Sequence, residues 1–246
     1  MKILAIDTSG QQATAAIVSE YITIGEVLLN ARTGEKAWTH SEILMPGIDQ
    51  LFSLTRLRPE EIDYVAYTCG PGSFTGLRIG AATALGMARA LDIQAIPVPT
   101  LDALAYNVVG IRNNGFVIPM LDARRGQVYT AIYGQSANDG ILGRESDYMA
   151  LPVEEAIQSM FATLDYSPSP GADVLFIGDG ADANAEVIRK ILPAAFIAPA
   201  NSNRLRASSV GVWATEKVLD GHTSFPDKVD ILYVRAPQAV REAKKT

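Results

Sequence analysis

Cysteine and histidine are scarce in this sequence: its 246 residues include one cysteine, Cys69, and two histidines, His40 and His222. A single cysteine excludes an internal disulfide and a Cys-x-x-Cys site, and it is typical of a protein from a reducing compartment. The two histidines are far apart, so neither a His-x-x-x-His nor a His-Glu-x-x-His pair can place two ligands on one helix face. We therefore expect no transition-metal site built from this chain alone.

Long apolar runs and excess positive charge are also missing. No apolar stretch approaches the length that crosses a bilayer, and the first apolar run reaches Asp7 too soon for a secretory signal peptide. We expect a cytoplasmic protein with no membrane contact. Lys and Arg number 21 against 27 Asp and Glu, which gives a net charge of −6. Such a chain is not expected to form the main phosphate-binding surface for RNA or DNA by itself, although it can belong to a complex with basic members.

Alternating and helical patterns divide the chain into two halves with the same order of elements. The first half is expected to contain strands near 3–7, 13–18, 22–29, 63–68 and 94–98, helices near 41–55, 76–90 and 101–109, and a helical turn at 59–61. The second half is expected to contain strands near 116–121, 127–133, within 141–148, 173–177 and 195–197, helices near 152–164, 181–192 and 208–219, and a loop at 167–171.

Each half is therefore predicted to have three strands followed by helix, strand, helix, strand and helix. This duplicated layout is typical of the actin/hexokinase-like (ASKHA) class, an α/β fold whose two lobes each have a mixed sheet flanked by helices. The expected lobes are residues 1–110 and 111–246, with the last helix and tail either in the second lobe or packed back on the first. A fold class of this kind does not by itself determine function.

A glycine-rich segment, 68–80, follows a predicted strand and begins a predicted helix. Its sequence, Thr-Cys-Gly-Pro-Gly-Ser-Phe-Thr-Gly-Leu-Arg-Ile-Gly, lets the backbone approach a phosphate, a carboxylate or another part of the protein closely. The spacing matches neither the P-loop nor the dinucleotide-binding fingerprint, so tight packing between strand and helix is the favoured interpretation. Ser73 is the nearest candidate for a nucleophile, but a helix-capping hydroxyl is the favoured interpretation there.

Small residues repeat every four positions along the predicted helix 76–90, at Gly76, Gly80, Ala84 and Ala88. This spacing places them on one ridge, where two backbones can approach closely. Packing on the chain's own sheet is favoured from the pattern alone, and contact with another protein is the alternative. Arg78 lies in the first turn, where the helix dipole disfavours a cation, so we expect an acidic neighbour within the chain or across an interface.

Two turns carry candidate vestigial nucleotide-binding residues. Asp7, Thr8 and Ser9 follow the first predicted strand, where an acid in the actin/hexokinase class can order the magnesium ion of a nucleotide. Aspartate also stabilises turns for purely local reasons, so this interpretation has a simpler alternative. Gly178 and Gly180 lie in a strand–helix turn, where that class contacts the nucleoside.

Two further segments have weaker signals. Arg124 and Arg125, in the hairpin turn of the second half, face either phosphates or, more simply, solvent. In the tail, Tyr233 and Val234 are expected to dock on the body of the protein.

Five segments of the sequence resemble the TsaB (YeaZ) family. They are Ile3–Ser9, the pattern His40-Ser41-Glu42-x-Leu44-x-Pro46, Gly70–Gly80, Leu121–Tyr129 and Tyr233–Ala239. The resemblance runs from one end of the chain to the other, and the Gly-Pro-Gly-Ser-Phe-Thr-Gly-Leu-Arg-x-Gly string is its most specific part. It implies a role in forming threonylcarbamoyladenosine in tRNA, at the adenosine beside the anticodon.

The resemblance also implies partners. In that family a larger paralogue, of the TsaD type, carries the chemistry, and the TsaB type is its dimerisation partner and scaffold, joined in bacteria by a TsaE-type ATPase. The implied role is a non-catalytic subunit that binds and activates the TsaD-type subunit, forms a homodimer when alone, and meets tRNA only through the complex. No cofactor is implied for this chain alone, and ATP and a metal ion would come with its partners.

The catalytic paralogue holds its metal with a His-x-x-x-His pair, and the matching positions here are Thr100 and Leu104, of which leucine cannot ligate a metal and threonine is a poor ligand. Pairing through the helices of the first lobe implies a set of partner-interface residues. These are His40, Leu44, Ile48, Leu51, Phe52, Gly76, Arg78, Gly80 and Ala84. Three alternatives remain: an independent nucleotide hydrolase or kinase of the actin/hexokinase class, a peptidase that acts on its partner through Ser73, and a homodimer without an obligate partner.

Overall fold

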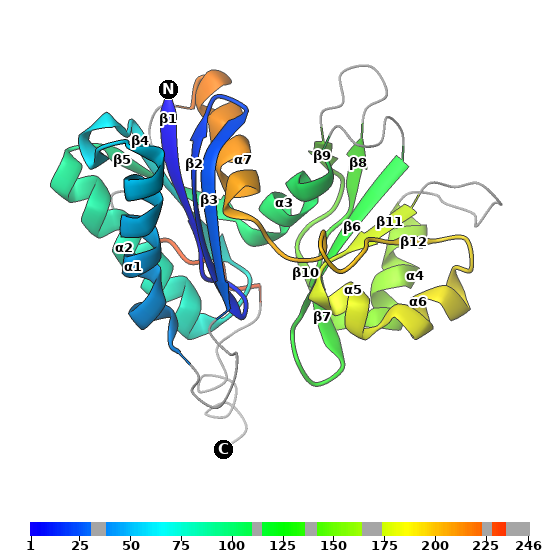
Figure 1. Ribbon diagram of the computed structural model, residues 1–246. Helices are drawn as coiled ribbons and strands as arrows, with labels where there is room; N and C mark the ends of the chain where they lie inside the picture. The colour runs from blue at the N-terminus through cyan, green and yellow to red at the C-terminus, as the bar shows by residue number, and fades with distance from the viewer. Residues whose placement is uncertain (31–37, 110–114, 136–141, 164–173, 223–227, 235–246) are drawn as a thin grey trace. The chain divides into compact units, whose positions relative to one another are not determined.

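The computed structural model describes residues 1–30, 38–109, 115–135, 142–163, 174–222 and 228–234 (Figure 1). The chain forms two compact units. Of the described residues, those within Met1–Ala103 and Arg206–Tyr233 form unit 1, and those within Leu104–Leu205 together with Val234 form unit 2. The chain therefore leaves unit 1 within a helix and returns to it at Arg206.

Unit 1 is built on a five-stranded sheet in the order β3-β2-β1-β4-β5. The strands are β1 (Lys2–Asp7), β2 (Gln12–Ser19), β3 (Ile22–Asn30), β4 (Tyr64–Gly70) and β5 (Gln94–Pro99). The first three are antiparallel neighbours, whereas β4 and β5 run parallel to β1, with Ala5 opposite Ala16 on one side and Ala66 on the other. Strand β1 is central, and all of its residues from Ile3 to Asp7 are buried.

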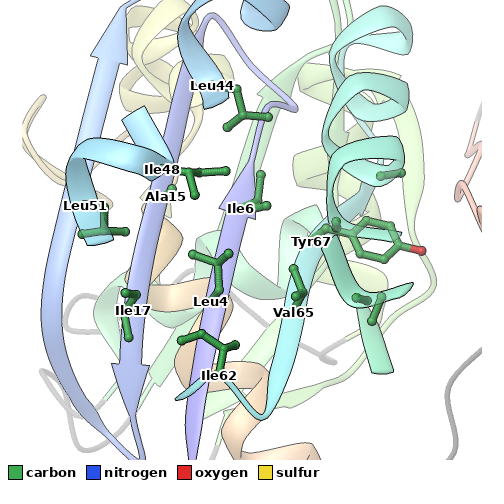
Figure 2. Packing of buried hydrophobic residues seen from close by; sticks show 14 of the residues in the cluster. Leu4, Ile6, Ala15, Ile17, Leu44, Ile48, Leu51, Ile62, Val65 and Tyr67 are labelled. Atoms are coloured by element: carbon green, nitrogen blue, oxygen red, sulfur yellow. The ribbon is translucent and has the colours of Figure 1, made fainter. Parts of the chain in front are cut away.

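Helices α1 (His40–Thr55), α2 (Phe74–Leu91) and α7 (Ala207–Leu219) cover the two faces of this sheet. The short helix η1 (Pro59–Glu61) precedes β4, α3 (Thr100–Ala105) follows β5 and contains the boundary between the units, and η2 (Tyr106–Val108) belongs to unit 2. Leu4 and Ile6 of β1 alternate onto the face that α1 and α2 cover, where Leu44, Ile48 and Leu51 of α1 join one apolar cluster (Figure 2). Helix α7 packs on the opposite face, because Gly211 brings its backbone against Ala5 and Val18.

Unit 2 repeats this strand order as β10-β7-β6-β11-β12, with β8 paired to β6 and β9 paired to β8. The strands are β6 (Gly115–Asp122), β7 (Gln127–Thr130), β8 (Tyr133–Gln135), β9 (Leu142–Arg144), β10 (Met149–Pro152), β11 (Val174–Ile177) and β12 (Phe196–Ile197). The helices are α4 (Val153–Thr163), α5 (Asp179–Ala183) and α6 (Ala185–Ile191). Its core joins Ile118 and Met120 of β6 to Ile157 of α4, Phe176 of β11 and Ile188 of α6.

The predicted elements are present throughout the described residues, with differences in unit 2. The strand expected at 127–133 is split into β7 and β8, which pair with different ends of β6. The weak strand expected within 141–148 is β9, and the strand that pairs with β7 is β10, farther along the chain. The helix expected at 181–192 is broken at Asn184, whose φ of −114° separates α5 from α6. The expected loop at 167–171 lies outside the described residues.

Candidate functional site

The end of β1 and the start of the turn after it are polar but buried, whereas the tip of the turn at Gly10 and Gln11 is exposed. Asp7, Thr8 and Ser9 are 2%, 0% and 6% exposed. One oxygen of Asp7, Oδ1, accepts hydrogen bonds from the Ser9 backbone N–H (2.9 Å) and from the Thr68 hydroxyl (2.7 Å). Burial raises the pKa of Asp7, and these hydrogen bonds together with the nearby His40 partly oppose that rise. The turn is therefore internally satisfied.

The glycine-rich segment packs against this turn. The Ser73 N–H donates to the Ser9 carbonyl (2.7 Å), and the Thr8 hydroxyl donates to the Gly76 carbonyl (2.7 Å). A Cβ on Gly76 would lie 2.0 Å from the Thr8 carbonyl oxygen, and one on Gly80 would lie 2.4 Å from the Thr8 hydroxyl oxygen. Only glycine fits at these two positions, so α2 seals the turn that follows β1. The packing interpretation of the glycine-rich segment is confirmed.

Ser73 and Cys69 are the two conceivable nucleophiles of this segment. The surroundings of each give its side chain a structural role. Ser73 is the N-cap of α2, and its hydroxyl accepts a hydrogen bond from the Gly76 N–H (3.3 Å). Cys69 is buried at the end of β4, and burial raises the pKa of its thiol to about 12. A thiol with such a pKa is not ionised at neutral pH, and the thiolate is the reactive form. The helix-cap interpretation of Ser73 is confirmed.

A segment that follows α7 docks beside the same turn. The Leu232 N–H donates to the Cys69 carbonyl (2.7 Å), and a Cβ on Gly70, whose φ is +117°, would lie 2.5 Å from the Leu232 carbonyl oxygen. The ring of Tyr233 lies 5.9 Å from that of Phe74 at the start of α2. The expected docking of Tyr233 on the body of the protein is thus confirmed.

Most of the predicted interface residues are buried inside unit 1. Leu44, Ile48 and Leu51 are each 2% exposed, and Phe52 is 8% exposed. The small-residue ridge of α2 is buried as well, at Gly76, Gly80, Ala84 and Ala88. In the single chain these side chains fill the space between the helices and their own sheet. Their part in a partner interface stays a prediction.

Exposed apolar residues lie instead on the opposite sides of the same helices. Met45 and Leu54 of α1 are 48% and 69% exposed, and Phe74 of α2 is 42% exposed. Arg78 is exposed as well, and its guanidinium lies 3.9 Å from the centre of the Phe74 ring. Within the described residues no ion pair to Arg78 is present, and the guanidinium makes a cation–π contact. An acidic neighbour across an interface stays a prediction.

His40, a predicted interface residue, is the first residue of α1 and is half-buried. It lies close enough to Asp7 to lower the pKa of that carboxyl group. Its Nε2 is buried and finds no hydrogen-bond partner among the described residues. His40 therefore lies beside the buried residues at the end of β1.

The corresponding turn of unit 2 is exposed. Asp122, Arg124, Arg125 and Gly126 are all solvent-accessible, and the last three have φ values of 62°, 56° and 71°. Oδ1 of Asp122 accepts a hydrogen bond from the Arg124 N–H (2.7 Å), which fixes the turn locally. The side chains of both arginines project from a turn, in agreement with the solvated-turn interpretation.

Gly178 and Gly180 allow a close approach between α5 and the end of β6. A Cβ on Gly178, whose φ is +114°, would lie 2.1 Å from the Met120 carbonyl oxygen, and one on Gly180 would meet the backbone at Met120 and Leu121. The Gly178 N–H donates to Oδ1 of Asn203 (2.9 Å). This backbone donor, in the turn assigned to nucleoside contact, is thus engaged by the chain itself.

Asn203 was not anticipated from the sequence. Its side chain is 3% exposed, and its Nδ2 donates to Oδ1 of Asp182 (2.6 Å) and to the Ala198 carbonyl (2.7 Å). One amide thereby joins the loop after β12 to the start of α5. No local pattern distinguishes it from its neighbour Asn201, which is exposed.

The two positions that match the metal ligands of the catalytic paralogue are fully buried in α3. Thr100 accepts a hydrogen bond on its hydroxyl oxygen from the Gly70 N–H (3.1 Å), and Leu104 has no exposed surface. In the part of the chain that the structure describes, no group of three or more His, Cys, Asp or Glu side chains is arranged to hold a metal ion. Likewise, none of the described helices combines the length and the apolar character needed to cross a membrane.

Two α/β units that share one strand order, each with a tight turn after its first strand, define a protein of the duplicated actin/hexokinase-like class. The sequence profile of the family described as "TsaD: tRNA N6-adenosine threonylcarbamoyltransferase" matches residues 34–239. A relative from Bacillus subtilis, "tRNA threonylcarbamoyladenosine biosynthesis protein TsaB", is 31% identical over 246 residues, which are 99% of this chain and 97% of the relative. The chain belongs to the TsaB (YeaZ) family.

Two further similarities agree with this assignment. The TsaB protein of Escherichia coli is 32% identical over 164 residues, which are 65% of this chain and 68% of that protein. The solved structure of "YeaZ from Pseudomonas aeruginosa" is 22% identical and superimposes with a TM-score of 0.73 over 94% of this chain and 99% of its own. At 22% identity, the similarity to this solved structure supports the fold only.

Proposed function

We propose that this protein takes part in the biosynthesis of threonylcarbamoyladenosine in tRNA as a non-catalytic subunit that binds and activates a TsaD-type catalytic subunit. The observation that carries the proposal is the similarity, over nearly the full length of both chains, to a protein named for this biosynthesis. A TsaE-type ATPase joins the complex, and tRNA reaches the chain only through it, consistent with the chain's net charge of −6.

The proposal includes that this chain catalyses no reaction by itself. Thr100 and Leu104 stand where the catalytic paralogue has its histidine ligands, and the hydroxyl of Thr100 is already bonded to Gly70. The turn at Asp7 is buried against α2, which leaves no open surface there for the phosphates and magnesium of a nucleotide. ATP and the metal ion then belong to the partners.

A calorimetric titration of the isolated chain with magnesium–ATP tests this part. We expect no saturable binding. Saturable binding at micromolar ATP would support the independent nucleotide hydrolase. The peptidase alternative lacks an activated nucleophile, because Ser73 caps α2 and the Cys69 thiol has a pKa near 12.

The exposed sides of α1 and α2 are the surface that we assign to the catalytic subunit. Apolar and aromatic side chains together with arginine are the residues that most often dominate protein interfaces. Met45, Leu54, Phe74 and Arg78 provide this combination on two helices that lie side by side on one face of the sheet (Figure 1). The buried ridge of Gly76, Gly80 and Ala84 supports this surface from below.

The affinity of the chain for the purified catalytic subunit tests this assignment. The variants Leu54→Lys and Arg78→Glu are expected to weaken binding at least about tenfold, which corresponds to about 1.4 kcal/mol. Leu219→Lys is the matched control, since Leu219 is 59% exposed but lies on α7, on the other face of the sheet. Unchanged affinity in both helix variants, with melting temperatures like that of the wild type, would contradict the assignment.

A further inference from the structure

The hairpin turn that joins β6 to β7 (Figure 1) has a backbone conformation that its own residues disfavour. Arg124, Arg125 and Gly126 have φ values of 62°, 56° and 71°. The Gln127 N–H donates to the Arg124 carbonyl (3.2 Å), which closes a tight turn around Arg125 and Gly126. Such positive φ values favour glycine and asparagine, because the Cβ of most other residues lies too close to the backbone. Arginine nevertheless occupies two adjacent positions here.

Elsewhere in the described residues, a non-glycine residue with positive φ occurs only singly, at Glu20, Arg56 and Asp92. Arg56 and Asp92 follow the last turns of α1 and α2, where a left-handed residue commonly ends a helix. The pair Arg124 and Arg125 has no such explanation. A conformation that costs free energy at two neighbouring residues indicates that their side chains are retained for a function.

The chain itself makes no use of the two guanidinium groups. Both arginines are exposed, and among the described residues neither guanidinium has an ion pair, a hydrogen bond or a ring contact. The neighbouring carboxylate of Asp122 accepts a hydrogen bond from the backbone N–H of Arg124 (2.7 Å). A Cβ on Gly126 would meet no atom within 4 Å. The tip of the turn is therefore open and presents two cations to a ligand.

The surroundings of the turn fit a phosphate backbone better than a protein surface. Protein interfaces combine arginine with apolar or aromatic anchors, whereas contacts to the nucleic-acid backbone depend on polar and cationic groups. Among the described residues of unit 2, the one large apolar side chain that is exposed is Phe196, at 55%. It lies on β12, which β6 and β11 separate from β7. The turn thus has charge without an apolar anchor, unlike the surface around Arg78.

We propose that Arg124 and Arg125 bind backbone phosphates of tRNA when the tRNA is held in the complex. This inference rests on the proposed function, which brings the chain and tRNA together. A guanidinium group can donate two parallel hydrogen bonds to the oxygens of one phosphate. Contacts of this kind position the RNA without reading its sequence. Two of them supply a local share of the phosphate contacts on a chain whose net charge is −6.

The affinity of the assembled complex for unmodified tRNA, measured over a range of salt concentrations, tests the proposal. The test variant combines Arg124→Asn with Arg125→Asn. Asparagine accepts a positive φ, so we expect a melting temperature at least equal to that of the wild type. We expect tRNA binding to weaken at least about tenfold, and the slope of log affinity against log salt to decrease by about 2, since two phosphate contacts are lost.

A variant that combines Arg189→Gln with Lys190→Gln is the matched control. It removes two adjacent exposed cations of the same unit, at the end of α6. We expect it to bind tRNA with wild-type affinity and slope. Wild-type binding by the turn variant, or an equal loss in the control, would overturn the proposal, because the effect would then be absent or would follow net charge alone.

Two further measurements separate this inference from the proposed function. In reconstituted tRNA modification, we expect the turn variant to raise the KM for tRNA more than it lowers kcat. We expect it to bind the purified catalytic subunit, without tRNA, with wild-type affinity. Loss of that affinity would assign the turn to a protein partner and overturn the phosphate contact. Product that forms without this chain would contradict the proposed function, whereas the salt-dependent binding assay requires no turnover and tests the turn in either case.

Discussion

The turns after β1 and after β6 occupy the same place in two units with the same strand order, yet the residues at the start of the turn are buried in unit 1 and accessible to solvent in unit 2. In unit 1, Asp7, Thr8 and Ser9 are almost fully buried under α2, which has 18 residues. In unit 2, the turn that begins at Asp122 is exposed, and the corresponding helix α5 has five residues. A long helix with glycines one turn apart can lie on the turn, whereas a short one only reaches the end of the strand.

The contrast shows how one fold position is put to different uses. In unit 1 the turn becomes part of the core and anchors α2, so it supports the outer surface of that helix. In unit 2 the close contact is made by Gly178 and Gly180 against Met120, and a side-chain amide from Asn203 secures it. Each unit therefore depends on a different small set of residues, and these sets can be changed separately.

A side chain added where α2 contacts the turn after β1 is expected to have the largest effect on stability. In Gly76→Val the new side chain would begin 2.0 Å from the Thr8 carbonyl oxygen, which is backbone and cannot move aside. We expect a loss of about 3–4 kcal/mol in the free energy of unfolding, measured by urea denaturation. Gly86→Ala, on the same helix with no atom near the added Cβ, is the control and should stabilise the protein by about 0.5–1 kcal/mol.

Removing the amide that secures the contact in unit 2 is expected to cost somewhat less. Asn203→Ala loses the hydrogen bonds to Gly178, Asp182 and Ala198 and leaves a buried N–H without a partner. The expected loss is about 2–3 kcal/mol of unfolding free energy. Asn201→Ala, at an exposed position of the same loop, should change stability by less than about 0.5 kcal/mol. Equal stabilities for the two variants would show that Asn203 does not secure unit 2.

Removing one hydrogen bond between α2 and the turn after β1, without adding volume, is expected to have a smaller effect on stability. Thr8→Val keeps the shape of the side chain and loses the hydrogen bond to the Gly76 carbonyl. Because the hydroxyl is fully buried, we expect a loss of about 1–2 kcal/mol, measured in the same denaturation assay. Thr8→Ser retains the hydroxyl and should recover part of the loss. A serine variant less stable than the valine variant would show that shape, rather than the hydrogen bond, holds the turn.

The pH dependence of stability tests whether the carboxyl group of Asp7 is buried. The pKa of Asp7 is raised in the folded protein, so the folded state holds this proton more tightly than the unfolded state. The contribution of Asp7 to stability is therefore greatest below the unfolded pKa of 3.8 and declines as the pH rises above it. Relative to Asp7→Asn, the wild type should lose stability as the pH rises above the unfolded pKa of 3.8.

The exposed turn of unit 2 provides the control for that measurement. Asp122→Asn retains the acceptor for the Arg124 N–H and should change stability by less than about 0.5 kcal/mol. If the difference between wild type and Asp7→Asn does not depend on pH, the carboxyl group of Asp7 does not behave as a buried acid.

The fold was largely predictable because its elements are encoded locally. Apolar runs separated by a polar turn predicted β1 and β2, alternation predicted β3, and the proline followed by two acidic residues predicted the short helix at Pro59–Glu61. The break at Asn184 was missed because the apolar pattern continues across it and the helix interruption depends on how α5 meets β6. The split of one strand into β7 and β8 depends on pairing with β6, which no local pattern contains.

The candidate site was less predictable, for a physical reason. Four-residue spacing identified the ridge of Gly76, Gly80 and Ala84 but could not say whether it faces the chain's own sheet or another protein, since both contacts require small residues. The structure assigns the ridge to the sheet. The hydrogen bonds of Asn203 link residues between 5 and 25 positions apart, so only the folded chain reveals them.

Reconstitution of the tRNA modification tests the central claim most directly. The catalytic TsaD-type subunit, the TsaE-type ATPase, threonylcarbamoyl-adenylate and unmodified tRNA would be combined with and without this chain, and the modified nucleoside quantified. We predict that product forms only when the chain is present and that the chain alone forms none. Product from the chain alone, or equal product when it is omitted, would contradict its assignment as a non-catalytic activating subunit.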